Sequence, residues 1–245
     1  MSGSRENATD PMTKESYPQL LSLAVHEFRT PVSVVGGYLR MLQRDAADPL
    51  TDRQRKMIDE AEKSCARLVA IIAQLSDISK LDAGLIGLAR QPLDVFPLMS
   101  EVAEHVHDAE DREVHLEVRG EAAGATVMGD AARLRTAFEA ILRAILREKP
   151  GPCTVVADRH RTTAAGPSSA VIVIAEEADV QAVYDGAPGT FDERRGGLGL
   201  ELPLARRIIE GHGGRVWSPA LVAADDEPRA RGSAVISLPL TESKR

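Results

Sequence analysis

Apolar residues recur every three or four positions along a stretch that begins at residue 20. Such a period gathers apolar side chains on one side of a helix, so the pattern predicts a long amphipathic helix from residue 20 to about residue 44. Asp48 and Pro49 follow it and favour a turn. The apolar positions of this helix are Leu20, Ala24, Val32, Val35, Leu39 and Leu42.

A second helix is predicted from residue 51 to about residue 81. Thr51 and Gln54 have the spacing of a capping box at its start. Apolar steps of three and four alternate along it, as in the seam of a helical bundle. The two helices therefore form a hairpin, which cannot bury both of its faces alone, and we expect a homodimer with a four-helix bundle. The seam positions of the second helix are Ile58, Ala61, Cys65, Leu68, Ile72 and Leu75.

After Gly84 and Gly87 the pattern changes to short β-like runs separated by helical segments. This alternation predicts an α/β sandwich. We expect a helical domain at residues 17–84 and a sandwich domain at residues 90–241. Residues 1–16 are polar and aperiodic, so we expect a flexible tail there. The expected strands lie near residues 93–95, 114–118, 126–128, 154–157, 171–174 and 233–238, and the expected helices near residues 96–106, 134–145 and 202–211.

Net charge and composition indicate the cellular compartment of the protein and the classes of partner that it can bind. The formal net charge is -7 and acids alternate with bases, so no broad basic surface for nucleic acid is expected. Apolar runs fall well short of the roughly 20 residues of a membrane span, and the N-terminus has no signal-peptide pattern. Cys65 and Cys153 lie far apart in apolar surroundings, which favours a reducing cytoplasm over a disulfide.

The strongest chemical signal is the segment Ala24-Val25-His26-Glu27-Phe28-Arg29-Thr30-Pro31 on the first helix. A neutral imidazole of His26 can attack phosphorus, and the adjacent Glu27 can hold the proton on the other ring nitrogen. Taken alone, His26 could equally be an ordinary surface histidine. The segment as a whole resembles the phosphoacceptor motif of sensor histidine kinases.

Two further residues of the motif have physical uses. Thr30 lies one helical turn beyond His26, where its hydroxyl can orient water toward an aspartyl phosphate on a docked receiver domain. In the family this spacing implies phosphatase activity. Pro31 lacks a backbone donor and frees a carbonyl just past the histidine.

The resemblance extends over about residues 17–240, because the second domain is similar to the ATP-binding sandwich of these kinases. Gly196, Gly197 and Gly199 keep the pattern of a family glycine box, and glycines let backbone amides approach phosphates. The family implies ATP and Mg²⁺ as cofactors. Glu201, however, stands where another glycine is usual, and its charge would oppose ATP phosphates.

Other positions depart further from the family. Ala140 and Ala144 occupy the places of two asparagines, one of which binds the magnesium of the nucleotide, and alanine has no oxygen for a hard cation. Ala175 replaces the aspartate that recognises adenine, unless a one-residue shift places Glu176 there. Glu177 and Asp179 replace two glycines. We therefore expect a degenerate nucleotide site, and a solvated loop at residues 179–195 where the family has a lid.

The sequence thus predicts a protein of two-component signalling whose His26 passes a phosphoryl group to an aspartate of a response regulator receiver domain. ATP-dependent autophosphorylation is one source of that group, and exchange with receivers alone is the other. A non-catalytic dimeric scaffold is the third interpretation. A separate sensory partner is expected, and no metal-ligating cluster of protein side chains.

Overall fold

The computed structural model describes most of the chain as two compact units, residues 1–86 and 87–245. The described residues are 12–44, 50–107, 109–163, 168–197, 199–219 and 232–241.

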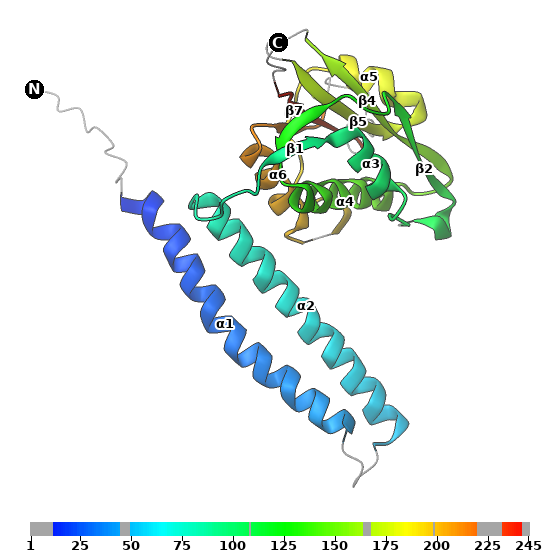
Figure 1. Ribbon diagram of the computed structural model, residues 1–245. Helices are drawn as coiled ribbons and strands as arrows, with labels where there is room; N and C mark the ends of the chain where they lie inside the picture. Colours follow the sequence, from blue (N-terminus) through cyan, green and yellow to red (C-terminus); the bar gives the residue numbers. More distant parts are fainter. Residues whose placement is uncertain are drawn as a thin grey trace, which may run out of the picture. The chain divides into compact units, whose positions relative to one another are not determined.

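The first unit is a helical hairpin of α1 (Met12–Arg44) and α2 (Asp52–Asp82) (Figure 1). The predicted capping box opens α2: Thr51 Oγ1 accepts the Gln54 N–H at 3.3 Å, and the Thr51 N–H donates to Gln54 Oε1 at 2.9 Å. Two otherwise unpaired amides are thereby satisfied, which explains why the helix begins there.

Helix α1 begins earlier than the apolar pattern indicated. It starts at Met12, so the prediction of a tail through residue 16 is wrong for residues 12–16, while residues 1–11 lie outside the described part. The helix also continues through Pro18 and Pro31. Because Pro31 has no N–H, the Glu27 carbonyl four residues earlier receives no hydrogen bond from it.

Small and apolar side chains fill the seam between α1 and α2. Val25, Cys65 and Ile72 are buried, and the Cys65 thiol donates to the Val32 carbonyl at 3.3 Å. A Cβ added to Gly36 would lie 3.2 Å from Cys65 Sγ, so the absence of a side chain at Gly36 lets the helices approach here.

One polar contact interrupts the apolar seam near the loop end of the hairpin. Gln43 Nε2 donates to Asp59 Oδ1 at 3.0 Å and to Glu62 Oε2 at 2.9 Å. Both carboxylates come from α2, three residues apart, so a single amide of α1 is held between two side chains of the partner helix.

The second unit contains a five-stranded sheet in the order β2-β4-β5-β7-β6 and a two-stranded sheet of β1 and β3. Strands β2 and β4 are parallel, and the other pairs are antiparallel. The strands are β1 (Gln91–Asp94), β2 (Val114–Gly120), β3 (Thr126–Gly129), β4 (Cys153–Thr162), β5 (Ser169–Glu176), β6 (Arg215–Trp217) and β7 (Ala234–Pro239). The longer helices are α3 (Val95–Ala103), α4 (Ala131–Glu148), α5 (Val180–Asp185) and α6 (Glu201–Gly211), with short 3-10 turns η1 (Glu110–Arg112), η2 (Glu177–Asp179) and η3 (Arg195–Gly197).

The predicted helical hairpin followed by an α/β domain is therefore confirmed. Every expected strand is present, although Val95 begins α3 instead of ending β1. The reason is Asp94, whose carboxylate accepts the Phe96 N–H at 3.2 Å and caps the helix at that point.

Helices cover both faces of the large sheet. Figure 1 shows α3, α4 and α6 on one face and α5 on the other. Side chains alternate along β5, so Ile172 and Ile174 point to one face and Val171 and Val173 to the other. Val183 of α5 packs in one apolar cluster with four side chains of the sheet, Val171, Val173, Ala175 and Val235.

The prediction of a solvated loop at residues 179–195 is wrong in part. Residues 180–185 form α5, and the side chains of Val183, Phe191 and Arg195 are buried, while most other side chains of the segment are exposed. Within the charged run, Glu193 binds Arg206 and Arg195 faces Glu148, whereas Arg194 is exposed.

His212 ties the end of α6 to the start of α4. Its Nδ1 lies 2.7 Å from the Ile208 carbonyl, and its Nε2 accepts the Asp130 N–H at 2.9 Å. These contacts require the neutral ring with its proton on Nδ1, and burial lowers the pKa of His212, which favours that form. His212 is thus the residue that caps the C-terminal end of α6.

Candidate phosphoacceptor and nucleotide sites

His26 and Glu27 lie side by side on the exposed surface of α1. Their side chains are 77% and 72% exposed, and His26 Nδ1 lies 3.5 Å from Glu27 Oε1. The preceding residue, Val25, is buried in the seam and fixes the orientation of this turn. The geometry leaves Nε2 of the imidazole open to a reactant while a carboxylate faces the other ring nitrogen.

Thr30 is exposed one turn beyond His26 on the same helix. A four-residue separation places two side chains on one face, so the Thr30 hydroxyl and the His26 imidazole are presented to the same neighbouring space. The three residues that the sequence singled out, His26, Glu27 and Thr30, are thus all on one exposed stretch of α1.

Gly196, Gly197 and Gly199, the glycines of the predicted glycine box, have different surroundings. All have φ near +65, which favours glycine, but only Gly196 is pressed against another element. A Cβ on Gly196 would lie 2.6 Å from Ala144 Cα of α4, whereas Gly197 and Gly199 would have no neighbour within 4 Å. Gly196 is therefore required for close packing on α4, independently of any phosphate.

Arg195 is a buried cation that sequence reasoning missed. Its side chain is 4% exposed; Nη1 donates to the Ser233 carbonyl at 2.7 Å and Nη2 to Ser218 Oγ at 3.1 Å. Its Nε lies 3.9 Å from Glu148 Oε1 of α4. Burial lowers the pKa of Arg195 and raises the pKa of Glu148, so each charge depends on the other for compensation.

The three alanines predicted to stand at the family's nucleotide positions are buried. Ala140 and Ala144 are 4% and 0% exposed and bring no oxygen to a metal, and Ala175 lies in the apolar cluster under α5. Glu176, the alternative adenine ligand, is 3.4 Å from Lys149 Nζ. Arg143 approaches Glu201 at 3.8 Å, which offsets its charge.

Two kinds of feature are absent from the described ranges. No group of three or more His, Cys, Asp or Glu side chains there is placed to hold a metal ion. None of the helices formed by these residues has both the length and the apolar character to cross a bilayer.

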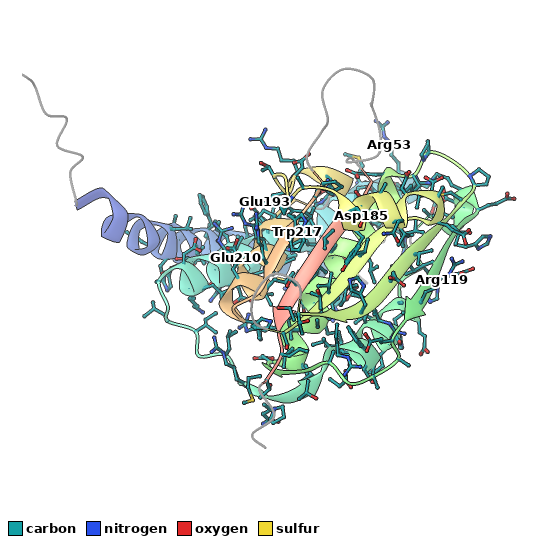
Figure 2. The ribbon with its side chains drawn as sticks, turned by 90° about the horizontal axis from the view of Figure 1, so that it is seen from above. Arg53, Arg119, Asp185, Glu193, Glu210 and Trp217 are labelled. Atoms are coloured by element: carbon teal, nitrogen blue, oxygen red, sulfur yellow. The ribbon has the colours of Figure 1, made fainter. Side chains whose placement is uncertain are left out.

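We predict that Gly196→Ala destabilises the sandwich domain more than Gly197→Ala. An alanine at this φ costs about 1–2 kcal/mol at either position, while the crowding against Ala144 adds roughly 1–3 kcal/mol only at position 196. Urea unfolding followed by the fluorescence of Trp217, the single tryptophan (labelled in Figure 2), measures both losses. Equal losses in the two variants would contradict the packing role of Gly196.

Comparison with known proteins matches each part of this arrangement. Residues 19–84 match the His Kinase A (phospho-acceptor) domain family. The chain is 29% identical over 227 residues to the sensor protein DivL of Caulobacter vibrioides, a match that covers 89% of this chain and 27% of DivL. It is 27% identical to the sensor protein GacS of Pseudomonas syringae, covering 92% of this chain and 25% of GacS. The chain thus spans about a quarter of the length of these relatives.

Solved structures share the fold. Full-length ShkA in complex with AMPPNP superposes with a TM-score of 0.65 at 20% identity, over 91% of this chain and 46% of ShkA. The histidine kinase AdeS of Acinetobacter baumannii gives a TM-score of 0.53 at 17% identity, over 88% of this chain and 98% of the AdeS chain. The exposed histidine on the hairpin, the matched domain and the relatives lead to one conclusion: the chain is a homologue of sensor histidine kinases, with a phospho-acceptor domain at residues 19–84 followed by an α/β domain.

Proposed function

We propose that His26 accepts a phosphoryl group and passes it to an aspartate of a response regulator receiver domain. The observation that carries this proposal is the exposed His26 with Glu27 at 3.5 Å on a phospho-acceptor hairpin. Nε2 attacks phosphorus while Glu27 stabilises the charge that develops on the ring. Thr30 then supports dephosphorylation of the receiver by orienting a water molecule.

The phosphoryl group on His26 has two candidate donors, ATP and a phosphorylated receiver. ShkA was solved with an ATP analogue, and the family uses ATP with magnesium, which supports autophosphorylation. The buried alanines at positions 140, 144 and 175 support exchange with receivers alone. A non-catalytic scaffold is the third candidate and requires His26 to carry no phosphate.

A homodimer is the second element of the proposal. Large apolar side chains remain exposed on both helices of the hairpin, and on α1 they recur at three- and four-residue spacing. The cavity of about 620 Å³ formed by Tyr38, Met41, Leu42 and Arg44 lies among them. A second copy would bury these side chains in a four-helix bundle. They are Val34, Val35, Tyr38, Met41 and Leu42 of α1, and Met57, Leu68, Val69 and Ile71 of α2.

The phosphoryl group is proposed to pass to a receiver in the cytoplasm. The input comes from a sensory partner or from a sensory region outside these 245 residues. The net charge of -7 disfavours a direct contact with nucleic acid.

We predict that His26→Gln abolishes acid-labile phosphate on the protein, because glutamine keeps polarity and size but has no nucleophilic ring nitrogen. The protein is incubated with ³²P-phosphorylated receiver domains, and separately with [γ-³²P]ATP and Mg²⁺. Phosphate on the protein is then counted after electrophoresis.

His115→Gln is the matched control, because His115 is an exposed histidine of β2, outside the hairpin. It is expected to retain full labelling. Labelling that survives in His26→Gln, or that disappears in His115→Gln, would contradict the assignment. No labelling of the parent protein from either donor would select the scaffold.

We predict that Thr30→Ala keeps phosphoryl transfer to His26 but slows dephosphorylation of the receiver by about 10²-fold, a usual contribution of a residue that positions a reactant. The half-life of the receiver aspartyl phosphate is measured with and without the variant. Thr30→Ser, which retains the hydroxyl, is expected to restore the rate. An unchanged half-life with Thr30→Ala would remove Thr30 from this role.

We predict that Tyr38→Glu weakens the dimer, because a charge replaces a side chain that is 64% exposed in the single hairpin and would be buried against a second copy. A buried large apolar side chain contributes about 1.5–3 kcal/mol, so the dissociation constant rises by at least about tenfold. Sedimentation equilibrium measures it. Ser33→Glu puts the same charge on exposed α1 surface outside the apolar set and is expected to leave the dimer intact.

A further inference from the structure

The glycine segment Arg195–Gly197 is fixed to α4 by three contacts. Gly196 packs on Ala144, the Gly196 N–H donates to the Glu148 carboxylate, and Arg195 faces the same carboxylate at 3.9 Å. Ala144 and Glu148 are one helical turn apart on α4, so a single face of this helix holds the whole segment.

The chain leading to this segment is fixed as well. The Gly189 N–H donates to the Ser218 carbonyl at 2.7 Å. Arg206 of α6 binds Glu193 Oε1 at 2.8 Å and Glu210 Oε1 at 2.7 Å; Figure 2 labels both glutamates. Phe191 is buried with its ring 5.3 Å from the Arg195 guanidinium carbon.

These contacts use the groups that a nucleotide phosphate would need. A phosphate at a glycine box is bound by backbone amides and nearby cations. Here the Gly196 amide and the Arg195 guanidinium are both directed to Glu148, whose carboxylate would itself repel a phosphate. Arg143 is balanced by Glu139 and Glu201, each at 3.8 Å.

We propose that the Arg195–Glu148 pair closes the former nucleotide site and makes it a structural joint between α4 and the ends of β6 and β7. The closed site takes no Mg-ATP. One consequence of this inference rests on the proposed function of His26. If the site takes no Mg-ATP, the phosphoryl donor to His26 is an aspartyl phosphate of a receiver domain.

The transfer balances without a nucleotide. His26 Nε2 attacks phosphorus and forms the N–P bond, while the P–O bond to the aspartyl carboxyl breaks and its electron pair leaves on the carboxylate. The Nδ1 proton faces Glu27, which offsets the positive charge of the ring. The reverse reaction delivers the group to a second receiver.

Two measurements on the unmodified full chain test the closure. Calorimetry with Mg-AMPPNP and with Mg-ADP is expected to show dissociation constants weaker than about 1 mM. The amide hydrogen of Gly196 is expected to exchange about 100-fold or more slowly than in an unstructured peptide, because the amide is bonded to Glu148. Tighter nucleotide binding overturns the closure, and so does an unprotected Gly196 amide even if no nucleotide binds.

Arg195→Lys tests the joint directly, since lysine keeps the charge but loses the planar set of donors that reach Ser233 and Ser218. We expect exchange at residues 195–197 to become about tenfold faster. Arg194→Lys, at the exposed neighbouring position, is the matched control and is expected to change nothing. Equal exchange in both variants overturns the role of Arg195. None of these outcomes depends on His26, whose labelling by receivers is a separate test.

Discussion

The contact between Gly196 and Ala144 determines how the second unit is assembled. Because neither residue has a side chain beyond Cβ, the backbone of the glycine segment lies directly on α4. That approach brings Arg195 within reach of Glu148 and of the ends of β6 and β7. A larger residue at either position would separate these elements and leave the buried Arg195 cation without Glu148, the carboxylate that compensates its charge.

The same alanine bears on two features of this region. Ala144 brings no oxygen to a metal, and its short side chain lets the backbone of Gly196 lie directly against α4. The phospho-acceptor hairpin, which lies in the other unit, keeps its exposed histidine and carboxylate.

The sequence predicted the elements whose signals are local. Periodic apolar residues indicated α2, the spacing of Thr51 and Gln54 indicated its capping box, and β-like runs indicated four of the five strands of the large sheet, all but β6, because these patterns depend on neighbours in the chain. The early start of α1 was missed because residues 12–16 have no apolar period. The motif around His26 could be recognised since its residues are contiguous.

The Arg195 joint could not be predicted in this way. Its partners Ser218, Ser233 and Glu148 lie 23, 38 and 47 residues from Arg195 in the chain, and Arg195 itself belongs to a charged run that is typical of exposed loops. Helix α5 was missed for a related reason: its one buried side chain, Val183, gives no periodic signal in a helix of 6 residues. Only the folded sheet supplies the apolar surface that α5 covers.

The amide of Gln43 has a mechanical consequence for the hairpin. It is held by carboxylates of two successive turns of α2, so sliding α1 along α2 by one helical turn would leave Asp59 or Glu62 facing apolar seam residues without a donor. An apolar seam alone tolerates such sliding, because one leucine or valine can replace another. The polar contact sets the register at the loop end of the hairpin, and any displacement of α1 at that end must carry α2 with it.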